Sequence, residues 1–238
     1  MNELALTPIA FLTSSVAGVM GMGGGILLIA LMPGFVPPGA IIPLHAATQL
    51  ASNSSRAIFG WRHIDLRLLP AFALGALLGA WLGSEIYQSL NLHWLPAIIG
   101  VLILYLAWLP PPRVGGGGQW ALVALGFYQT GLGMIAGATG PLGAAVLLRR
   151  NRDRDWLVVN TGAYMTLAHA MRVAAFFVMG FSFAAWWELL LGMILASIAG
   201  SWLGTKLRAG VGQVQFQRWF KWLVTVLAIR MIVLPFLT

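Results

Sequence analysis

Apolar stretches alternate with short polar loops along the whole chain, and their lengths predict helices. We expect a first set of helices at 5–20, 26–34, 39–60, 66–86 and 91–110, and a second set at 119–135, 141–149, 155–180, 183–205 and 217–237. A helix that crosses a bilayer needs about 20 residues, so each set holds two short helices followed by three that can cross. The N-terminal segment 1–20 carries Glu3 instead of a basic segment, and we interpret it as part of the mature protein, not a signal peptide.

The composition indicates that these helices lie in a membrane. Of the 238 residues, 59% are hydrophobic and 8% are charged, whereas a soluble domain has about 25% charged residues. That is too little polar surface to cover a soluble globule, so we predict an all-α polytopic membrane protein. The net charge of +8 is explained by Lys and Arg in cytoplasmic loops, and we expect no nucleic-acid partner. The absence of cysteine excludes disulfides and thiolate metal sites.

Three short patterns occur twice, in the same order, and predict two homologous halves. They are the glycine-rich segments 21–25 and 137–141, the arginines Arg56 and Arg172, and the Gly-x-Trp-Leu-Gly segments 79–83 and 200–204. The first two recur at an offset of 116 residues and the third at 121. Between the copies, the Pro- and Gly-rich stretch 111–118 cannot continue a helix. We therefore predict a first transmembrane repeat over 1–110, a linker over 111–118 and a second repeat over 119–238.

The distribution of basic residues predicts how the two repeats are oriented. Basic loops contain Arg62, Arg67, Arg113, Arg149, Arg150, Arg152, Arg154, Lys206, Arg208 and Arg218. The loops at 33–40, 87–90 and 180–182 contain none. If each short pair is a re-entrant hairpin, every basic loop falls in the cytoplasm, as the positive-inside rule requires; if each pair were one broken span, the basic loops would be divided between both faces. We therefore predict two inverted repeats, about six crossings plus two hairpins, with both termini periplasmic.

The glycine-rich segments are candidate anion sites. Glycines at 21–25 permit a tight hairpin tip near the membrane midplane, after which a helix restarts and points free N–H groups and a positive dipole end at the protein centre. Thr139 and Gly140 repeat the arrangement from the other side. The alternative is that these glycines only let helices approach closely. Duplication at a helix break in an inverted repeat favours the site.

Polar residues form a stripe along one predicted crossing helix in each half. The first stripe is His45, Thr48, Gln49, Ser52, Asn53 and Arg56; its counterpart is Thr161, Tyr164, Met165, Ala168, His169 and Arg172. Such a stripe must face the bundle interior or a wet cavity. Arg56 lies near a helix end, where the alternative is that it extends to the membrane interface. Arg172 lies deeper, so a functional role is favoured for it.

The acidic residues indicate which charge the cargo carries. All six of them lie at or near predicted helix ends or the N-terminus: Glu3, Asp65, Glu85, Asp153, Asp155 and Glu188. A cation pathway built on buried carboxylates is therefore disfavoured, although His45 or His169 remains a candidate proton carrier. An interior that is basic and rich in donors suits a small oxyanion.

The sequence resembles the sulfite exporter TauE/SafE family, also called the toluenesulfonate uptake permease group. The resemblance rests on the segment 21–25, on Ala46-Ala-Thr-Gln-Leu-Ala-Ser-Asn53 followed by Arg56, and on the duplicated segment 137–141. It implies secondary transport of sulfite, sulfonate or sulfoacetate-like anions across the bacterial inner membrane. The candidate substrate-binding residues are Gly23, Gly24, Gly25, Gln49, Ser52, Asn53, Arg56, Thr139, Gly140, Tyr164, His169 and Arg172.

Three classes of function stay open at this point. The first is a secondary transporter that moves a small anion by alternating access, and the second is a passive anion channel built on the same repeat. The third, a membrane-embedded enzyme, lacks a paired nucleophile and base in the sequence, so we expect no enzyme. We expect no cofactor and no metal, a small anion and the lipid bilayer as partners, and a homodimer is compatible with the sequence.

Overall fold

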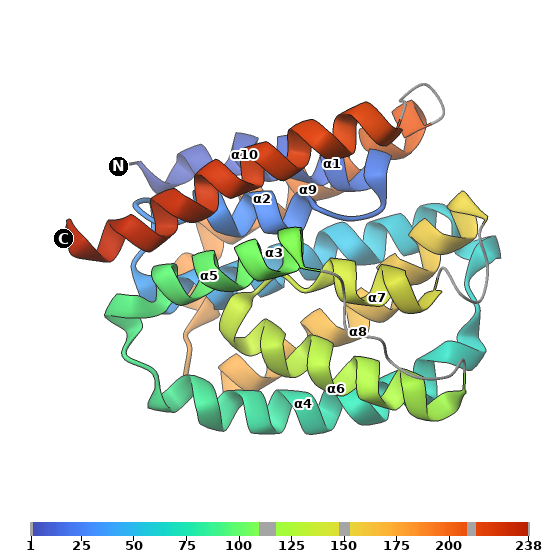
Figure 1. Ribbon diagram of the computed structural model, residues 1–238, viewed down its shortest axis with the longest axis horizontal. Helices are drawn as coiled ribbons and strands as arrows, with labels where there is room; N and C mark the ends of the chain where they lie inside the picture. The colour runs from blue at the N-terminus through green and yellow to red at the C-terminus, as the bar shows by residue number, and fades with distance from the viewer. Residues whose placement is uncertain (1, 110–117, 148–152, 209–212, 238) are drawn as a thin grey trace.

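The computed structural model describes residues 2–109, 118–147, 153–208 and 213–237, and there the fold is built from helices (Figure 1). The first half contains α1 (Leu6–Met20), α2 (Gly24–Leu31), α3 (Pro38–Phe59), α4 (Leu69–Ser89) and α5 (Leu95–Trp108). The second half contains α6 (Gln119–Ala136), α7 (Gly140–Leu147), α8 (Arg154–Val178), α9 (Trp187–Leu207) and α10 (Gln213–Val233). Two short helices and three longer ones thus occur in each half. The predicted linker lies outside the described residues except for Gly118.

The helix boundaries differ from the predicted ones by up to four residues, and three of the helices are instructive. Helix α2 begins at Gly24, inside the glycine run, because Gly23 with φ 94° completes the turn before it. Helix α10 begins at Gln213, four residues before the predicted start at 217; hydropathy marks only the apolar part, while Gln and Arg are good helix formers. Helix α5 has 14 residues, which is shorter than the stretch 91–110 expected to cross.

Within the described ranges, four stretches are long and apolar enough to cross a membrane by length and composition: Glu3–Met20, Leu66–Ser89, Phe183–Leu207 and Trp219–Phe236. Helices α3 and α8, with 22 and 25 residues, are also long enough. They carry the two polar stripes, which lower their hydropathy. The chain therefore has the features of a polytopic membrane protein, in which α3 and α8 present polar side chains to the interior.

The helices of the two halves pack reciprocally. Helix α1 of the first half runs along α9 of the second, and α6 of the second half runs along α4 of the first, as the lower edge of Figure 1 shows for α4 and α6. The two stripe-bearing helices, α3 and α8, contact each other, and α5 contacts α10. Exchanging the two halves leaves this set of contacts unchanged, as expected for a duplicated unit. The membrane orientation of each half stays a prediction.

The repeated Gly-x-Trp-Leu-Gly segments allow α4 and α9 to approach their partner helices. A β-carbon at Gly200 would collide with the backbone of Phe11 on α1, and one at Gly79 would collide with the backbone of Phe127 on α6. These two contacts are equivalent under the repeat. Close helix packing therefore explains these glycines, since helices in lipid associate through backbone proximity and dispersion contacts.

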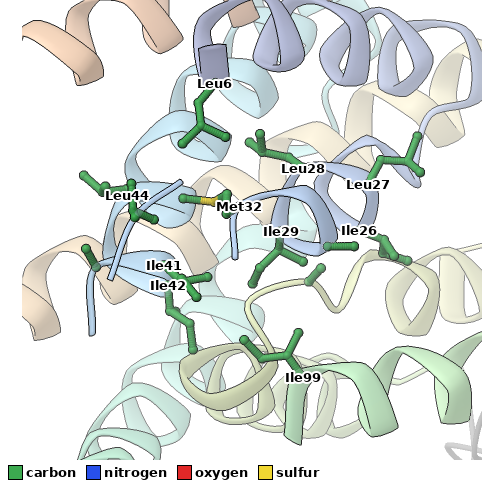
Figure 2. Close-up of a cluster of buried hydrophobic side chains, with 14 of the residues drawn as sticks. Leu6, Ile26, Leu27, Leu28, Ile29, Met32, Ile41, Ile42, Leu44 and Ile99 are labelled. Atoms are coloured by element: carbon green, nitrogen blue, oxygen red, sulfur yellow. The ribbon is translucent and has the colours of Figure 1, made fainter. Parts of the chain in front are cut away.

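The short helix α2 is enclosed by apolar side chains. Figure 2 shows its side chains Ile26, Leu28 and Ile29 gathered with those of α1, α3 and α5, and all three are buried. Because lipid is as apolar as this core, the enclosure stabilises the helix through close packing instead of removal from water. An eight-residue helix held in this way presents its first turn at a fixed position in the protein centre.

Both termini lie at one end of the molecule, on the left in Figure 1. Helix α4 ends there at Ser89, and its first residue, Leu69, follows the loop that contains Arg67 at the opposite end. With 21 residues at about 1.5 Å each, α4 spans about 30 Å, the thickness of a bilayer core.

We expect the Ser89 end of α4 to be periplasmic and the Arg67 end cytoplasmic, because Lys and Arg are retained in cytoplasmic loops. In this cysteine-free chain, Ser89→Cys should react with an impermeant maleimide on intact cells. Arg67→Cys should react only after permeabilisation, and the free C-terminus should be accessible with Ser89. Equal labelling of both cysteines on intact cells would contradict this topology.

Candidate functional site

Two helix breaks face each other in the centre of the molecule. Helix α1 ends at Met20, the next residue Gly21 has a left-handed φ of 79°, and α2 starts at Gly24. Helix α6 ends at Ala136, the next residue Gly137 has a φ of 70°, and α7 starts at Gly140. Only glycine adopts this conformation without strain, and it is a usual end of a helix. We call the segments 21–23 and 137–139 the first and second tip.

A cavity with about 380 Å³ of empty space, part of it open to the surroundings, lies between the two tips. Its lining comes from both halves and includes nine of the twelve predicted site residues: Gly23, Gly24, Gly25, Gln49, Asn53, Arg56, Thr139, Gly140 and His169. Ala17, Gly21, Met22, Ile26, His45, Ala138, Thr161 and Met165 complete it. No residue of this lining is acidic. We call it the central cavity.

The first turn of α2 offers backbone N–H groups to the central cavity. The first amides of any helix lack an intrahelical acceptor, and no side chain caps α2. The imidazole of His45 fixes this turn, because its Nε2 donates to the carbonyl oxygen of Gly25 at 2.9 Å. Since a carbonyl only accepts, His45 carries its proton on Nε2 when neutral, and its buried Nδ1 has no partner.

The second tip is fixed by a pair of hydrogen bonds to α6. The hydroxyl of Thr139 donates to the carbonyl of Gln129 at 2.9 Å, and the amide of Gln129 donates to the carbonyl of Thr139 at 3.2 Å. The Thr139 hydroxyl therefore donates its proton within the protein and does not donate to a ligand. Thr139 contributes to the site by fixing the backbone at the start of α7.

The polar stripe of α3 supplies side-chain donors. Asn53 donates to the carbonyl of Gln49 at 2.7 Å, and its own oxygen accepts from the Nη2 of Arg56. Asn53 thus positions Arg56 and has little capacity left for a ligand. In the part of the chain that the structure describes, the Nε2 of Gln49 and the Nε and Nη1 of Arg56 have no partner, although both side chains are only 3% exposed.

Three predicted site residues lie outside the lining of the central cavity. Ser52 exchanges hydrogen bonds with Ser201 of α9, with their hydroxyl oxygens 3.1 Å apart. The ring of Tyr164 packs on Phe72, with 4.9 Å between the centroids. Both side chains face neighbouring helices. Residues spaced three and four positions apart cover a wide face of a helix, and only part of that face borders the cavity.

Arg172 is the third of these residues, and it contacts backbone instead of the cavity. Its Nη1 donates to the carbonyl of Gly137 at 2.5 Å and to that of Gly133 at 3.4 Å, and its Nε donates to Ala168 at 3.3 Å. The last carbonyls of a helix lack partners and carry the negative end of its dipole. Arg172 therefore compensates part of its charge at the end of α6 and holds the second tip, while its Nη2 has no partner among the described residues.

Three stripe residues that line the central cavity were not among the predicted site residues: His45, Thr161 and Met165. The repeat offset of 116 residues relates Thr161 to His45 and Met165 to Gln49. The duplication could therefore have indicated that Thr161 and Met165 line the site, as Gln49 was predicted to do. His169, the counterpart of Asn53, brings its ring to 5.9 Å from that of His45. The two imidazoles close one side of the central cavity.

The central cavity combines the features of an anion site. Two helix N-termini, the Nε and Nη1 of Arg56 and the Nε2 of Gln49 converge on it, and all of these groups are hydrogen-bond donors. The only ion pair among the described residues joins Arg208 to Asp155, so neither Arg56 nor Arg172 is neutralised by a carboxylate there. A buried, unneutralised cation in a membrane protein indicates a functional counter-ion.

The glycines at the two helix starts are predicted to respond differently to substitution. A β-carbon at Gly24 would collide with the Thr13 backbone, whereas the nearest atom to one at Gly140 is 4.0 Å away. Gly140→Val should therefore place bulk in the cavity and lower anion affinity by about tenfold or more while the melting temperature stays near wild type. Gly24→Ala should lower stability by about 1–3 kcal/mol. Calorimetry and thermal unfolding measure both, and unchanged affinity in Gly140→Val would indicate that this glycine only serves packing.

Comparisons with known proteins agree with this picture. The family model described as sulfite exporter TauE/SafE matches residues 6–231, nearly the whole chain. A curated relative, the probable inner membrane transporter protein TsaS of Comamonas testosteroni, is 29% identical over 168 residues. This match covers 66% of the present chain and 66% of that protein, slightly under two thirds of its length. No solved structure matches.

Proposed function

Because this chain belongs to the sulfite exporter TauE/SafE family, we propose that it is a secondary transporter of a small sulfur-containing or organic anion. Sulfite, sulfonates and sulfoacetate are the substrates that the resemblance implies, and the bacterial inner membrane is the compartment. The single observation that carries the proposal is Arg56, a buried guanidinium with two unpaired nitrogens at a cavity where two helix N-termini meet. The family and its relative are named for transport, and we propose no enzymatic activity.

The central cavity is the proposed binding site. An oxyanion there would accept hydrogen bonds from the first turns of α2 and α7, from Gln49 Nε2 and from the guanidinium of Arg56. His169 adds a further donor when its cavity-facing nitrogen carries the proton. Each of these donors lines the cavity before the anion arrives. Both halves of the site come from one chain, so this site does not require a homodimer.

A difference between the equivalent arginines supports alternating access. Arg172 bonds the carbonyl of Gly137 at the second tip, whereas Arg56, its counterpart in the repeat, faces the cavity. The last carbonyls of α1 accept instead from Arg208, at Gly18, and from Arg154, at Val19. The two halves thus hold the same residues in two local states. Exchange of these states would release Arg172 toward the cavity and bring Arg56 to the first tip, as inverted repeats permit.

Ligand-induced stabilisation of the purified protein tests the binding step. Sulfite, sulfate, thiosulfate, sulfoacetate and taurine should be screened by thermal shift, because preferential binding to the folded state raises apparent stability. Uptake into proteoliposomes then tests the mechanism: a carrier gives saturable flux and counterflow, while a passive channel gives neither. Absence of any anion-dependent shift and of any anion flux would reject the proposed function.

A further inference from the structure

A second cavity, with about 810 Å³ of empty space, opens at the end of the molecule where α3 ends and α8 begins. Its lining consists of Arg56, Phe59, Gly60, His63, Arg154, Asp155, Val159, Thr205 and Arg208. Arg56 is the single residue that it shares with the central cavity. The guanidinium of Arg56, 3% exposed and with unpaired Nε and Nη1, therefore borders both spaces.

The charge of the second cavity is positive. Arg154 donates from Nη2 to the carbonyl of Val19 at 3.0 Å, and its buried Nε has no partner among the described residues. Arg208 pairs with Asp155 at 2.7 Å, and that carboxylate is the only acid in the lining. Three arginines thus face one carboxylate, which leaves Arg56 and Arg154 without a counter-ion among the described residues.

The cavities at the other end of the molecule differ in charge. One, with about 860 Å³ of empty space, is lined mainly by prolines and apolar residues, with His93 as its only ionisable side chain. Another is lined by Glu3 and Glu188. An anion is therefore attracted at the Arg154 end and is not attracted by the lining at the opposite end.

We propose that the second cavity is an anion vestibule: a separate binding site for a small oxyanion, from which the anion passes to the central cavity along Arg56. The proposal rests on the proposed function. Arg154 and Arg56 hold the anion in the vestibule, and the anion then moves past Arg56, which borders both spaces, into the central cavity, where the two helix N-termini complete the coordination. Arg208 does not bind the anion, because Asp155 already compensates its charge, and its role is to fix the edge of the vestibule.

Charge-selective modification tests the vestibule without transport. Thr205 lines it and the chain has no cysteine, so Thr205→Cys gives a single reporter thiol. A sulfonate-bearing methanethiosulfonate should modify this thiol about tenfold faster than a trimethylammonium-bearing one, relative to the control Ser89→Cys at the other end. Sulfoacetate should slow the modification. Arg154→Gln should abolish the preference, and Arg62→Gln, an exposed arginine at the same end, should not.

Transport kinetics provide the second measurement. Arg154→Gln should lower kcat/KM for sulfite uptake by about five- to tenfold near 10 mM salt, where the Debye length is about 30 Å, and by less than about twofold near 1 M, where it is about 3 Å. Arg154→Lys should restore most of the loss. A purely structural role of Arg154 at Val19 predicts a loss that salt does not change.

The outcomes separate the two proposals. Suppose that the wild-type protein transports the anion. If the thiol of Thr205→Cys then reacts equally fast with both reagents, or if the effect of Arg154→Gln on kcat/KM does not depend on salt, the vestibule is overturned and the proposed transport function stands. An anion-selective Thr205→Cys in a protein that transports none of the anions tested would support the vestibule and reject the proposed function.

Discussion

Replacing Arg56 by glutamine is expected to lower the affinity for the transported anion by about 1.5–3 kcal/mol, roughly 10- to 100-fold, and to stop measurable uptake. The reason is that a charge-assisted hydrogen bond from a buried guanidinium is among the strongest contacts available to an oxyanion. Arg56→Lys should lose less, because it keeps the charge but loses the planar fork that contacts two oxygens. Calorimetry with sulfoacetate and flux in proteoliposomes measure the two effects.

The same substitution is expected to leave the empty protein as stable as wild type, or more stable. Arg56 has one hydrogen-bond partner, Asn53, and two buried nitrogens without any. Removing a buried charge that nothing compensates relieves a desolvation cost. The melting temperature without ligand should therefore stay constant or rise while binding is lost. A lower melting temperature together with unchanged affinity would show that Arg56 is a structural residue and that the anion binds elsewhere.

The sequence predicts the helices and the tips well because both depend on local signals. Hydropathy locates the ten helices to within a few residues, and the glycines at 21 and 137 mark the two turns where only glycine adopts the required φ. The duplication, visible at an offset of 116 residues, predicts that the same unit occurs twice. Which helices of the two halves become neighbours depends on long-range packing, and the sequence pattern does not specify it.

Side-chain direction within the polar stripes is the part that the sequence could not predict. Periodicity places Asn53, Arg56, His169 and Arg172 on inward faces, but it does not say whether a donor is already used by backbone. In the structure, Asn53 donates to the carbonyl of Gln49 and accepts from Arg56, and Arg172 donates to the carbonyl of Gly137. Such pairing depends on carbonyls freed at a helix end in another part of the chain.

Arg172→Ala is expected to lower stability and to abolish transport, in contrast to Arg56→Gln. The guanidinium of Arg172 is fully buried and donates to three backbone carbonyls. Its removal leaves the carbonyl of Gly137 without a donor, and an unsatisfied buried group costs about 1–3 kcal/mol. The second tip then loses the contact that fixes the start of α7. We expect the melting temperature to fall and uptake to be lost.

Anion affinity should fall less in Arg172→Ala than in Arg56→Gln, because Arg172 does not line the central cavity in this conformation. Arg172→Lys retains one charged donor for Gly137 but cannot reach Ala168 as well, so its melting temperature should lie between wild type and Arg172→Ala. Thermal unfolding, calorimetry with sulfoacetate and flux in proteoliposomes, performed on the Arg56 and Arg172 variants together, separate the two roles. If Arg172→Ala keeps the wild-type melting temperature and loses affinity as Arg56→Gln does, Arg172 binds the anion directly, as its position in the sequence first indicated.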